Sequence, residues 1–366
     1  MKYIDEFRDP ATARHLIERI KRLARGRRLR LMEFCGGHTH AIGRYGLGRL
    51  LAPEVELLSG PGCPVCVTSA TDLDYAIALA AVPGTALATF GDMLRVPGSG
   101  GRSLMHARSE GADVRLVYSP LDALELARRD RTRPVVLLGV GFETTAPGVA
   151  ATLLQADAEG IGNLLLLSLH KLTPPAMRAI LSGGDSRLDG IIGPGHVSAV
   201  TGSDAWRFVP DDFGVGVAVS GFEPLDMLQA VASLVEMAVD GRPRVENCYG
   251  RGVAAGGNTA AQGLLARCFD IGAAEWRGLG TLPASGLGLG KALQHRDARL
   301  VYPLDVPPAP EPPGCRCGDV LRGALVPTAC PLFGRRCTPR DPVGPCMVSA
   351  EGSCAAHYRY AEVPDA

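Results

Sequence analysis

The sequence lacks a long hydrophobic run. Its longest aliphatic stretch, residues 164–169, is far shorter than the roughly 18 residues that a membrane-spanning helix needs. The first ten residues, MKYIDEFRDP, mix both charges and contain no apolar core of the signal-peptide type. We therefore expect no membrane span and no secretory signal, and we expect an intracellular setting.

An excess of one charge is also lacking. Lys+Arg and Asp+Glu each number 38, so the formal net charge is zero. This balance argues against a protein that binds nucleic acid through a basic face. The phosphate-binding patterns Gly-x-Gly-x-x-Gly and Gly-x4-Gly-Lys-[Ser/Thr] are absent from the expected strand–helix junctions, so a nucleotide site is not expected.

Short apolar runs that end in glycine-rich turns alternate along the chain with helix-compatible segments. This alternation favours an α/β fold with parallel sheets and crossover helices. A basic amphipathic helix is expected within residues 1–28, and another helix over 69–81. The expected strands are residues 29–34, 55–58, 85–89, 114–118, 134–140, 164–169, 190–192 and 215–220.

Three pairs of similar segments occur in the same order and indicate an internal duplication. Residues 31–40 resemble 137–145, residues 60–72 resemble 193–204, and residues 119–122 resemble 223–226. We therefore predict two similar α/β units, residues 1–130 with the N-terminal helix and residues 131–240. Residues 241–366 are expected to form an irregular region, a proline-rich linker over 303–313 and a cysteine-rich domain.

The chain contains eleven cysteines. In a chain without an export signal they indicate metal or redox chemistry rather than a disulfide framework. Four thiolates can hold a [4Fe–4S] cluster or a structural zinc ion. Zinc sites usually contain two Cys-x2-4-Cys pairs, and their absence favours the [4Fe–4S] cluster over zinc. The spacing alone does not show which four cysteines bind the cluster. Six cysteines lie close together near the end of the chain: Cys315, Cys317, Cys330, Cys337, Cys346 and Cys354.

The motif Cys63-Pro-Val-Cys66 lies between an expected strand and an expected helix. At a helix N-terminus the helix dipole and the free N–H groups lower the pKa of a thiol. This pair could therefore act as a two-electron dithiol or disulfide, or it could be half of a metal site.

The motif Cys35-Gly-Gly-His38-Thr-His40 follows the expected strand 29–34. Open α/β sheets bind ligands at such strand ends, and a cysteine there is a soft ligand for Fe(II) or Cu(I). His38 and His40 could be ligands, proton donors or structural hydrogen-bonding groups. Glu143 is the counterpart of His38 in the duplication, and it either interacts with a helix dipole or handles protons. We predict that Cys35, Cys63/Cys66 and Glu143 face one cleft.

Together these motifs are similar to those of the HypD family, which matures [NiFe]-hydrogenases. The similarity rests on residues 35–40, 60–66, 141–147 and 193–198 and on the cysteine-rich tail. It therefore covers nearly the whole chain.

The resemblance implies a cytoplasmic scaffold for assembly of the Fe(CN)2CO moiety of the hydrogenase. It implies a complex with HypC, cyanide delivered by HypE with HypF acting upstream, and transfer to the hydrogenase large subunit. It also implies that Cys35 ligates the iron together with a cysteine of HypC, and that Cys63 and Cys66 form a redox-active disulfide. The family's [4Fe–4S] pattern fits four cysteines of the tail, namely Cys315, Cys330, Cys337 and Cys354. It leaves Cys317 and Cys346 without a place in the pattern.

Two other functions compete with this one. The first is a self-contained iron–sulfur oxidoreductase that acts on a small molecule, with Cys63 and Cys66 as its dithiol. The second is a zinc-stabilised interaction module without redox chemistry.

Overall fold

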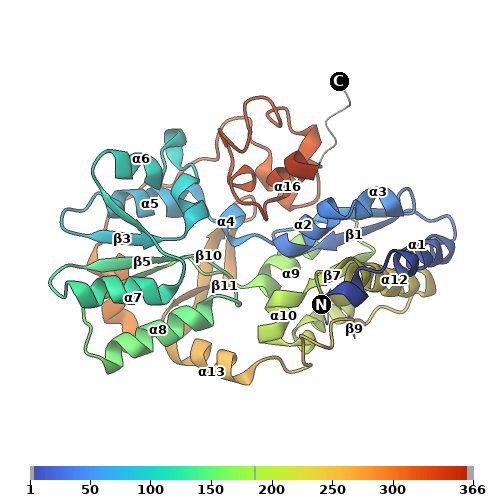
Figure 1. The fold of residues 1–366 in the computed structure, drawn as a ribbon, viewed down its shortest axis with the longest axis horizontal. Helices are drawn as coiled ribbons and strands as arrows, with labels where there is room; N and C mark the ends of the chain where they lie inside the picture. The colour runs from blue at the N-terminus through green and yellow to red at the C-terminus, as the bar shows by residue number, and fades with distance from the viewer. Residues whose placement is uncertain (1–3, 185–186, 361–366) are drawn as a thin grey trace.

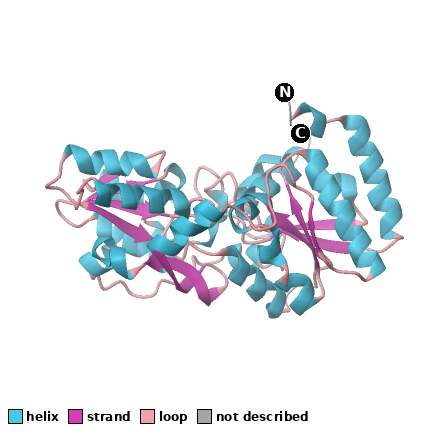
Figure 2. Cartoon of the chain, turned by 90° about the horizontal axis from the view of Figure 1, so that it is seen from below, coloured by secondary structure: helices cyan, strands magenta, loops and turns pink. Residues whose placement is uncertain are grey.

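Two helix-covered parallel sheets lie side by side, and a cysteine-rich segment packs between them (Figure 1, Figure 2). The computed structural model describes residues 4–184 and 187–360. Within these ranges no helix has both the length and the apolar character that crossing a membrane requires.

The larger sheet has five parallel strands in the order β2-β1-β7-β8-β9. Alternate residues of its strands face opposite sides, and both sides of the central strands are buried under helices. Leu31 packs with α1, α3 and α12, whereas Met32 packs with α9, α10 and α11. The strands are β1 Leu29–Glu33, β2 Val55–Ser59, β7 Gly190–Pro194, β8 Gly216–Ser220 and β9 Val245–Asn247. The helices are α1 Pro10–Ala24, α3 Leu47–Leu51, α9 Thr173–Gly183, α10 Gly195–Thr201, α11 Phe208–Phe213 and α12 Pro224–Asp240.

The smaller sheet has four parallel strands in the order β4-β3-β5-β6. Leu138 faces a buried cluster with α5 and α6, and Leu137 faces another with α7, α8 and α13. The strands are β3 Ala86–Thr89, β4 Asp113–Leu116, β5 Val135–Gly139 and β6 Leu164–Ser168. The helices are α5 Ala70–Ala80, α6 Leu104–Ser109, α7 Pro120–Arg129, α8 Ala146–Ala158 and α13 Thr259–Cys268.

Residues 241–300, which the sequence predicts to be irregular, contain an antiparallel hairpin. Its strands are β10 Phe269–Trp276 and β11 Gly280–Leu289. Isolated bridges join the hairpin to Thr68 and to Lys171, so it links segments near both sheets. The short helix α14 (Ala298–Val301) follows, and the proline-rich linker over 303–313 contains no helix or strand.

The cysteine-rich segment contains two helices, α15 (Cys317–Leu321) and α16 (Ser353–Tyr360). It rests on α2 (Gly36–Arg44), which α16 contacts, and on α4 (Pro64–Val67), which contacts the short turn Pro345–Met347. The tail is therefore packed against the two segments that carry the other cysteine motifs.

The predicted α/β class with parallel sheets is confirmed, and the eight expected strands correspond to β1–β8 within a few residues. The expected N-terminal helix forms over Pro10–Ala24, with Asp9 accepting a hydrogen bond from the Thr12 N–H. Residues 1–3 of that predicted range, and residues 361–366 of the predicted third domain, lie outside the described residues.

The sheets do not divide the chain at residue 130. Strands β1 and β2 pair into one sheet with β7, β8 and β9, while β3, β4, β5 and β6 form the other. The predicted units 1–130 and 131–240 therefore each contribute to both sheets. The matched turns 60–62 and 193–195 both end strands of the larger sheet. Similar turns reflect similar local strand-to-helix geometry, and they do not specify which strands pair.

Candidate functional site

A crevice opens in the larger sheet at the ends of β1 and β7. These strands are neighbours, and the chain leaves β1 toward β2 on one side and β7 toward β8 on the other. Ligands of open α/β sheets bind at such switch points. Cys35 follows β1 and His196 follows β7, and their Sγ and Nδ1 atoms are 3.9 Å apart. The crevice therefore brings a thiol and an imidazole together.

Cys35 is held by its own strand and helix. It is the N-terminal flanking residue of α2, and its carbonyl accepts the N–H groups of His38 and Thr39. Its N–H donates to Glu33 Oε2 at 2.7 Å, and the Thr39 hydroxyl donates to the other oxygen of Glu33. Burial raises the pKa of Glu33 to about 7. Glu33 was not among the predicted site residues, although a carboxylate inside an apolar run was a usable signal.

Three glycines let other segments approach Cys35 closely. A Cβ on Gly62 would lie 2.3 Å from the Cys35 nitrogen. A Cβ on Gly36 would lie 2.4 Å from Glu351 Cβ, and one on Gly37 would lie 2.9 Å from the Phe222 ring. The β2 turn, the tail and the β8 turn therefore meet around this thiol.

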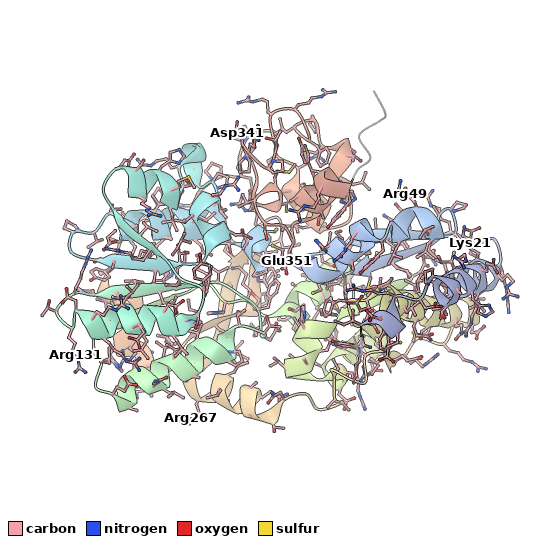
Figure 3. The ribbon with its side chains drawn as sticks, in the orientation of Figure 1. Lys21, Arg49, Arg131, Arg267, Asp341 and Glu351 are labelled. Carbon is pink, nitrogen blue, oxygen red and sulfur yellow. The ribbon has the colours of Figure 1, made fainter. Side chains whose placement is uncertain are left out.

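A cavity of about 380 Å³ opens beside the crevice. His196 and Phe222 line it, and so do side chains of both charges, namely Arg8, Arg44, Glu223 and Glu351. Arg8 is already paired with Glu223. Figure 3 shows Glu351 at the centre of the molecule, between the two sheets and below the cysteine-rich segment. Gly37, two residues after Cys35, also lines this cavity.

Burial sets the electrostatics of this crevice. It raises the pKa of the Cys35 thiol to about 12, with the charge of Glu33 adding to the effect. Burial also lowers the pKa of His196. A neutral thiol and a neutral imidazole are the forms expected near pH 7. When a metal ion binds, it displaces the proton of the thiol. Cys35 and His196 are therefore better suited to bind a soft cation than to act through a free thiolate.

The two histidines predicted from the Cys35 motif occupy different positions. His38 is buried, and its Nε2 donates to the carbonyls of Ser220 and Gly221 at 3.2 and 3.0 Å. Burial lowers the pKa of His38 to about 4, and its ring stacks on Phe222. His40 lines the cavity and forms a 2.7 Å hydrogen bond with the Tyr360 hydroxyl. His38 therefore orders the crevice wall, and His40 lies at the cavity.

Glu143 follows β5 in the smaller sheet. Its carboxylate accepts hydrogen bonds from the Thr173 N–H at 2.8 Å and the Thr173 hydroxyl at 2.9 Å. Burial raises its pKa to about 7. The structure joins Cys35 to the Cys63 turn through Gly62, whereas the contacts of the Glu143 carboxylate are at the start of α9. Cys35 and the Cys63 turn therefore meet at Gly62, and the common cleft with Cys66 and Glu143 stays a prediction.

Cys63 and Cys66 begin the short helix α4 as free thiols. The Cys66 N–H donates to Cys63 Sγ at 3.4 Å. Burial raises the pKa of Cys66 well above its ordinary value, and its thiol also has a hydrogen-bond contact with Cys346. Cys346 in turn contacts Cys317 and Cys354. Cys346, one of the two tail cysteines that the [4Fe–4S] pattern leaves over, therefore lies between Cys66 and the other tail thiols.

The six tail cysteines line one small apolar cavity. All are free thiols, and each is buried or half-buried. Within residues 4–184 and 187–360, no three His, Cys, Asp or Glu side chains stand together as a site for a single metal ion. A cluster that distributes its thiolates over several irons does not need that arrangement. The lining cysteines are Cys315, Cys317, Cys330, Cys337, Cys346 and Cys354.

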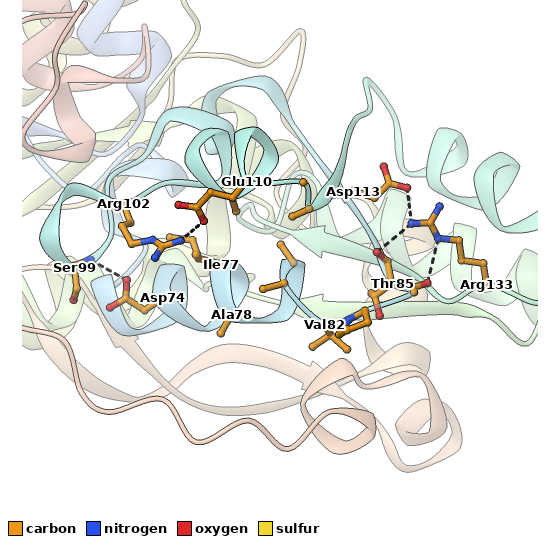
Figure 4. A pocket seen from close by; sticks show the side chains of 17 residues that line it. Asp74, Ile77, Ala78, Val82, Thr85, Ser99, Arg102, Glu110, Asp113 and Arg133 are labelled. Atoms are coloured by element: carbon orange, nitrogen blue, oxygen red, sulfur yellow. Dashed lines mark hydrogen bonds and ion pairs between the residues drawn. The ribbon is translucent and has the colours of Figure 1, made fainter.

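A larger cavity, of about 670 Å³, lies beside α5 and α6, the helices that pack on one face of the smaller sheet. Figure 4 shows Arg102 beside Glu110, and Arg133 beside Asp113 and Thr85. The Arg133–Asp113 ion pair spans 2.7 Å. Because these charged side chains are paired with one another, this cavity offers no convergent set of groups for a ligand.

Comparisons with known proteins place the chain in one family. The family model described as HypD, hydrogenase formation hypA family, matches residues 11–361. The chain is 51% identical to the hydrogenase maturation factor HypD of Azotobacter vinelandii, with 98% of this chain and 97% of that protein covered. It is 48% identical to the HypD of Rhizobium leguminosarum bv. viciae, with 98% and 96% covered. It is 45% identical to the HypD of Escherichia coli K12, with 98% of each chain covered.

Proposed function

Because this chain belongs to the HypD family of hydrogenase maturation factors, we propose that it is the scaffold on which the Fe(CN)2CO moiety of [NiFe]-hydrogenase is assembled. The iron unit is the cargo of this scaffold. Cys35 holds it together with a cysteine of HypC, and HypE delivers cyanide that originates from HypF. The finished unit then passes to the hydrogenase large subunit.

The observation that carries this proposal is the contact between Cys35 and His196 at the switch point of the larger sheet. Thiolate and imidazole are both ligands that suit Fe(II). The Cys35 thiol is buried and protonated, so it releases a proton when it takes up the metal. The adjoining cavity, with Gly37 at its base, leaves room for diatomic ligands and for a partner's thiol.

The donor set of the tail fits a [4Fe–4S] cluster. Soft thiols from separate loops converge on one apolar cavity, and no disulfide consumes them. The cysteines that would hold the cluster are Cys315, Cys330, Cys337 and Cys354. Such a cluster, when bound, supplies single electrons.

Cys63 and Cys66 form the second redox group of the proposed scaffold. The chain of thiol contacts from Cys66 through Cys346 to Cys354 supports electron exchange between this pair and the tail. Cys63 belongs to the turn that contacts Cys35, because the Gly36 N–H donates to the Gly62 carbonyl at 3.0 Å. The pair therefore lies between the electron store and the cargo thiol.

The alternative, a self-contained oxidoreductase acting on a small molecule, has weaker support. A thiol that attacks an external disulfide must be accessible and ionised. Cys66 is 0% exposed and Cys63 is 3% exposed. Buried thiols of this kind are better suited to exchange electrons with other groups of the same protein than with an external substrate.

Anaerobic co-purification with HypC in cells that supply HypE and HypF tests the proposal. We expect infrared bands of metal-bound cyanide and CO in the complex. Cys35→Ala should lose these bands and keep the brown colour of an iron–sulfur cluster, and Cys354→Ala should bleach the cluster. A wild-type complex without cyanide or CO bands would contradict the scaffold. A colourless protein that binds zinc would favour the interaction module.

A further inference from the structure

A tight turn in the tail carries two of the cavity cysteines. The Phe333 N–H donates to the Cys330 carbonyl at 3.0 Å, and the Cys337 N–H donates to the Leu332 carbonyl at 2.9 Å. These four residues all line the cysteine cavity. The turn is therefore part of the wall of this cavity.

Exposed arginines occupy this turn and the one that follows it. Arg335 and Arg336 directly precede Cys337, and Arg340 lies in the next turn, where the Thr338 N–H donates to the Asp341 carbonyl at 3.1 Å. All three arginines are exposed, and none has an ion pair with a described residue. Asp341 is the only acidic residue in either turn. We call Arg335, Arg336 and Arg340 the arginine surface.

Two aromatic side chains connect the arginine surface with the cavity. Phe333 lines the cavity, and the centroid of its ring is 6.0 Å from that of Tyr358, in an edge-on arrangement. Tyr358 is 42% exposed, and a Cβ on Gly334 would lie 4.0 Å from its ring. The exposed tyrosine therefore lies beside the turn, and the ring of Phe333 lies between it and the cysteine cavity.

This combination of side chains fits the docking of a protein with negative charge. Arginine and tyrosine are enriched in protein interfaces, where they contribute much of the binding energy. Unpaired surface charge of one sign attracts an oppositely charged partner and accelerates the encounter. The whole chain has a formal net charge of zero, so the positive excess is local. A small positive area favours a protein contact over the extended basic face that binds nucleic acid.

We propose that the arginine surface and Tyr358 form the docking site for a small acidic electron-transfer protein that reduces the [4Fe–4S] cluster. This inference rests on the proposed function, because it needs a cluster in the cysteine cavity. One electron leaves the reduced iron–sulfur centre of the acidic protein and enters the cluster, and no covalent bond forms or breaks. Encounters between electron-transfer proteins bury little surface, so the attraction between opposite charges has a large influence on their rate.

A reduced plant-type [2Fe–2S] ferredoxin, which is an acidic protein, serves as the probe. The full-length chain is reconstituted anaerobically with iron and sulfide, and stopped-flow absorbance gives the second-order rate constant for reduction of its cluster. For wild type we expect this rate constant to fall as salt is added, because salt screens the charges. The double exchange Arg335→Glu/Arg336→Glu should lower it at least about tenfold at low salt and flatten its salt dependence.

Binding is measured separately from electron transfer. Fluorescence anisotropy of a labelled, oxidised ferredoxin should show binding to Arg335→Glu/Arg336→Glu that is at least about tenfold weaker than to wild type. Tyr358→Ala should weaken binding as well but keep the salt dependence, because it removes no charge.

Two controls separate docking from other effects. Arg131→Glu/Arg267→Glu makes the same change of charge at two exposed positions far from the tail (Figure 3) and should keep the rate constant near that of wild type. Dithionite needs no docking site, so it should reduce the cluster of every variant at the same rate.

Four results would overturn the inference. The first is equal binding and equal rate constants for wild type and Arg335→Glu/Arg336→Glu. If that variant does not hold the cluster, Arg340→Glu and Tyr358→Ala decide, and wild-type binding by both refutes the docking site. The third is a DNA duplex that binds more tightly than ferredoxin and is released by the arginine exchange, which would assign the surface to nucleic acid. The fourth is a wild-type chain that takes up no cluster, which would refute the cluster assignment together with the electron step. A loaded chain that does not bind ferredoxin would refute the docking site alone.

Discussion

The Sγ of Cys35 lies 3.9 Å from Nδ1 of His196, and the two residues end neighbouring strands that are far apart in the sequence. The ring of His196 stacks on Phe222 with 3.9 Å between ring centroids, and Phe222 stacks on His38 at 4.8 Å. This stack holds the imidazole against the thiol. The arrangement places His196 beside the thiol that we propose holds the iron cargo, although His196 was not among the predicted site residues.

Replacing His196 with alanine removes this imidazole and should weaken the retention of iron. We expect about 10- to 100-fold lower affinity for iron in the complex with HypC, because a side chain beside a metal-bound group commonly contributes that much. Iron content per chain after anaerobic gel filtration measures it. His15→Ala on the exposed side of α1 is the matched control. Wild-type iron content in His196→Ala would contradict this role.

Gly62→Ala should destabilise the protein and displace Cys35. The added Cβ would meet the Cys35 nitrogen at 2.3 Å and the Cys35 Cα at 2.6 Å, and backbone atoms cannot yield as a flexible side chain can. Overpacking of this kind costs about 1–3 kcal/mol, which lowers the melting temperature by several degrees. Gly148→Ala in α8 meets nothing within 4 Å and should be neutral or stabilising. Equal melting temperatures for the two variants would refute the close approach.

The contribution of the Glu143 carboxyl to stability should fall as the pH rises from about 4.5 to about 7. Burial raises the pKa of Glu143 from 4.5 to about 7. Between these values the folded protein binds more protons than the unfolded chain, so the free energy of unfolding decreases with pH. The contribution of Glu143 is fully present below pH 4.5 and amounts to about 3 kcal/mol at most.

Urea unfolding of Glu143→Gln at several pH values measures this contribution. The difference in unfolding free energy between wild type and the variant should change between pH 4.5 and 7 by the Glu143 contribution, because Glu33, whose pKa is raised, and His38, whose pKa is lowered, contribute their opposite slopes to both proteins. Glu110→Gln exchanges a glutamate whose side chain is 59% exposed and should keep the wild-type slope. An unchanged slope in Glu143→Gln would mean that this carboxyl titrates normally.

Cys346→Ala should keep the iron–sulfur cluster that Cys354→Ala loses. Cys346 is 1% exposed and has thiol contacts with Cys66, Cys317 and Cys354, which suits a connecting thiol rather than a ligand. Iron and acid-labile sulfide after reconstitution measure the difference, and Cys268→Ala serves as a buried-cysteine control. Loss of the cluster in Cys346→Ala would move Cys346 into the ligand set.

The local elements of this fold were predictable from the sequence. The strands β1–β8 were predictable because each is a short apolar run that ends at a glycine or a polar turn, a pattern set by neighbouring residues, whereas β9 and the hairpin strands β10 and β11 were not predicted. The helix over Ala70–Ala80 was predictable for the same reason, since Ser69 accepts a hydrogen bond from the Asp72 N–H. The positions of Cys35 and Cys63 at the ends of elements follow from the same local rules.

The division into units was not predictable in the same way. Similar strand-to-helix turns occur at Gly60 and Gly193, and the sequence analysis assigned them to different units. Both turns belong to one sheet, because β1 pairs with β7. Pairing of parallel strands depends on which apolar faces become buried together. The residues next to a strand do not show which other strand it pairs with.

Residue type and spacing along the chain are enough to indicate the chemical groups of this protein: a thiol after a strand, a dithiol at a helix start and six thiols near the end of the chain. These features are local because they depend on residue type and spacing. Which distant groups meet depends on the fold, which places His196 against Cys35 and Cys346 against Cys66. Such contacts join residues far apart in the sequence, and they arise from burial of both faces of two sheets whose strands come from separate parts of the chain.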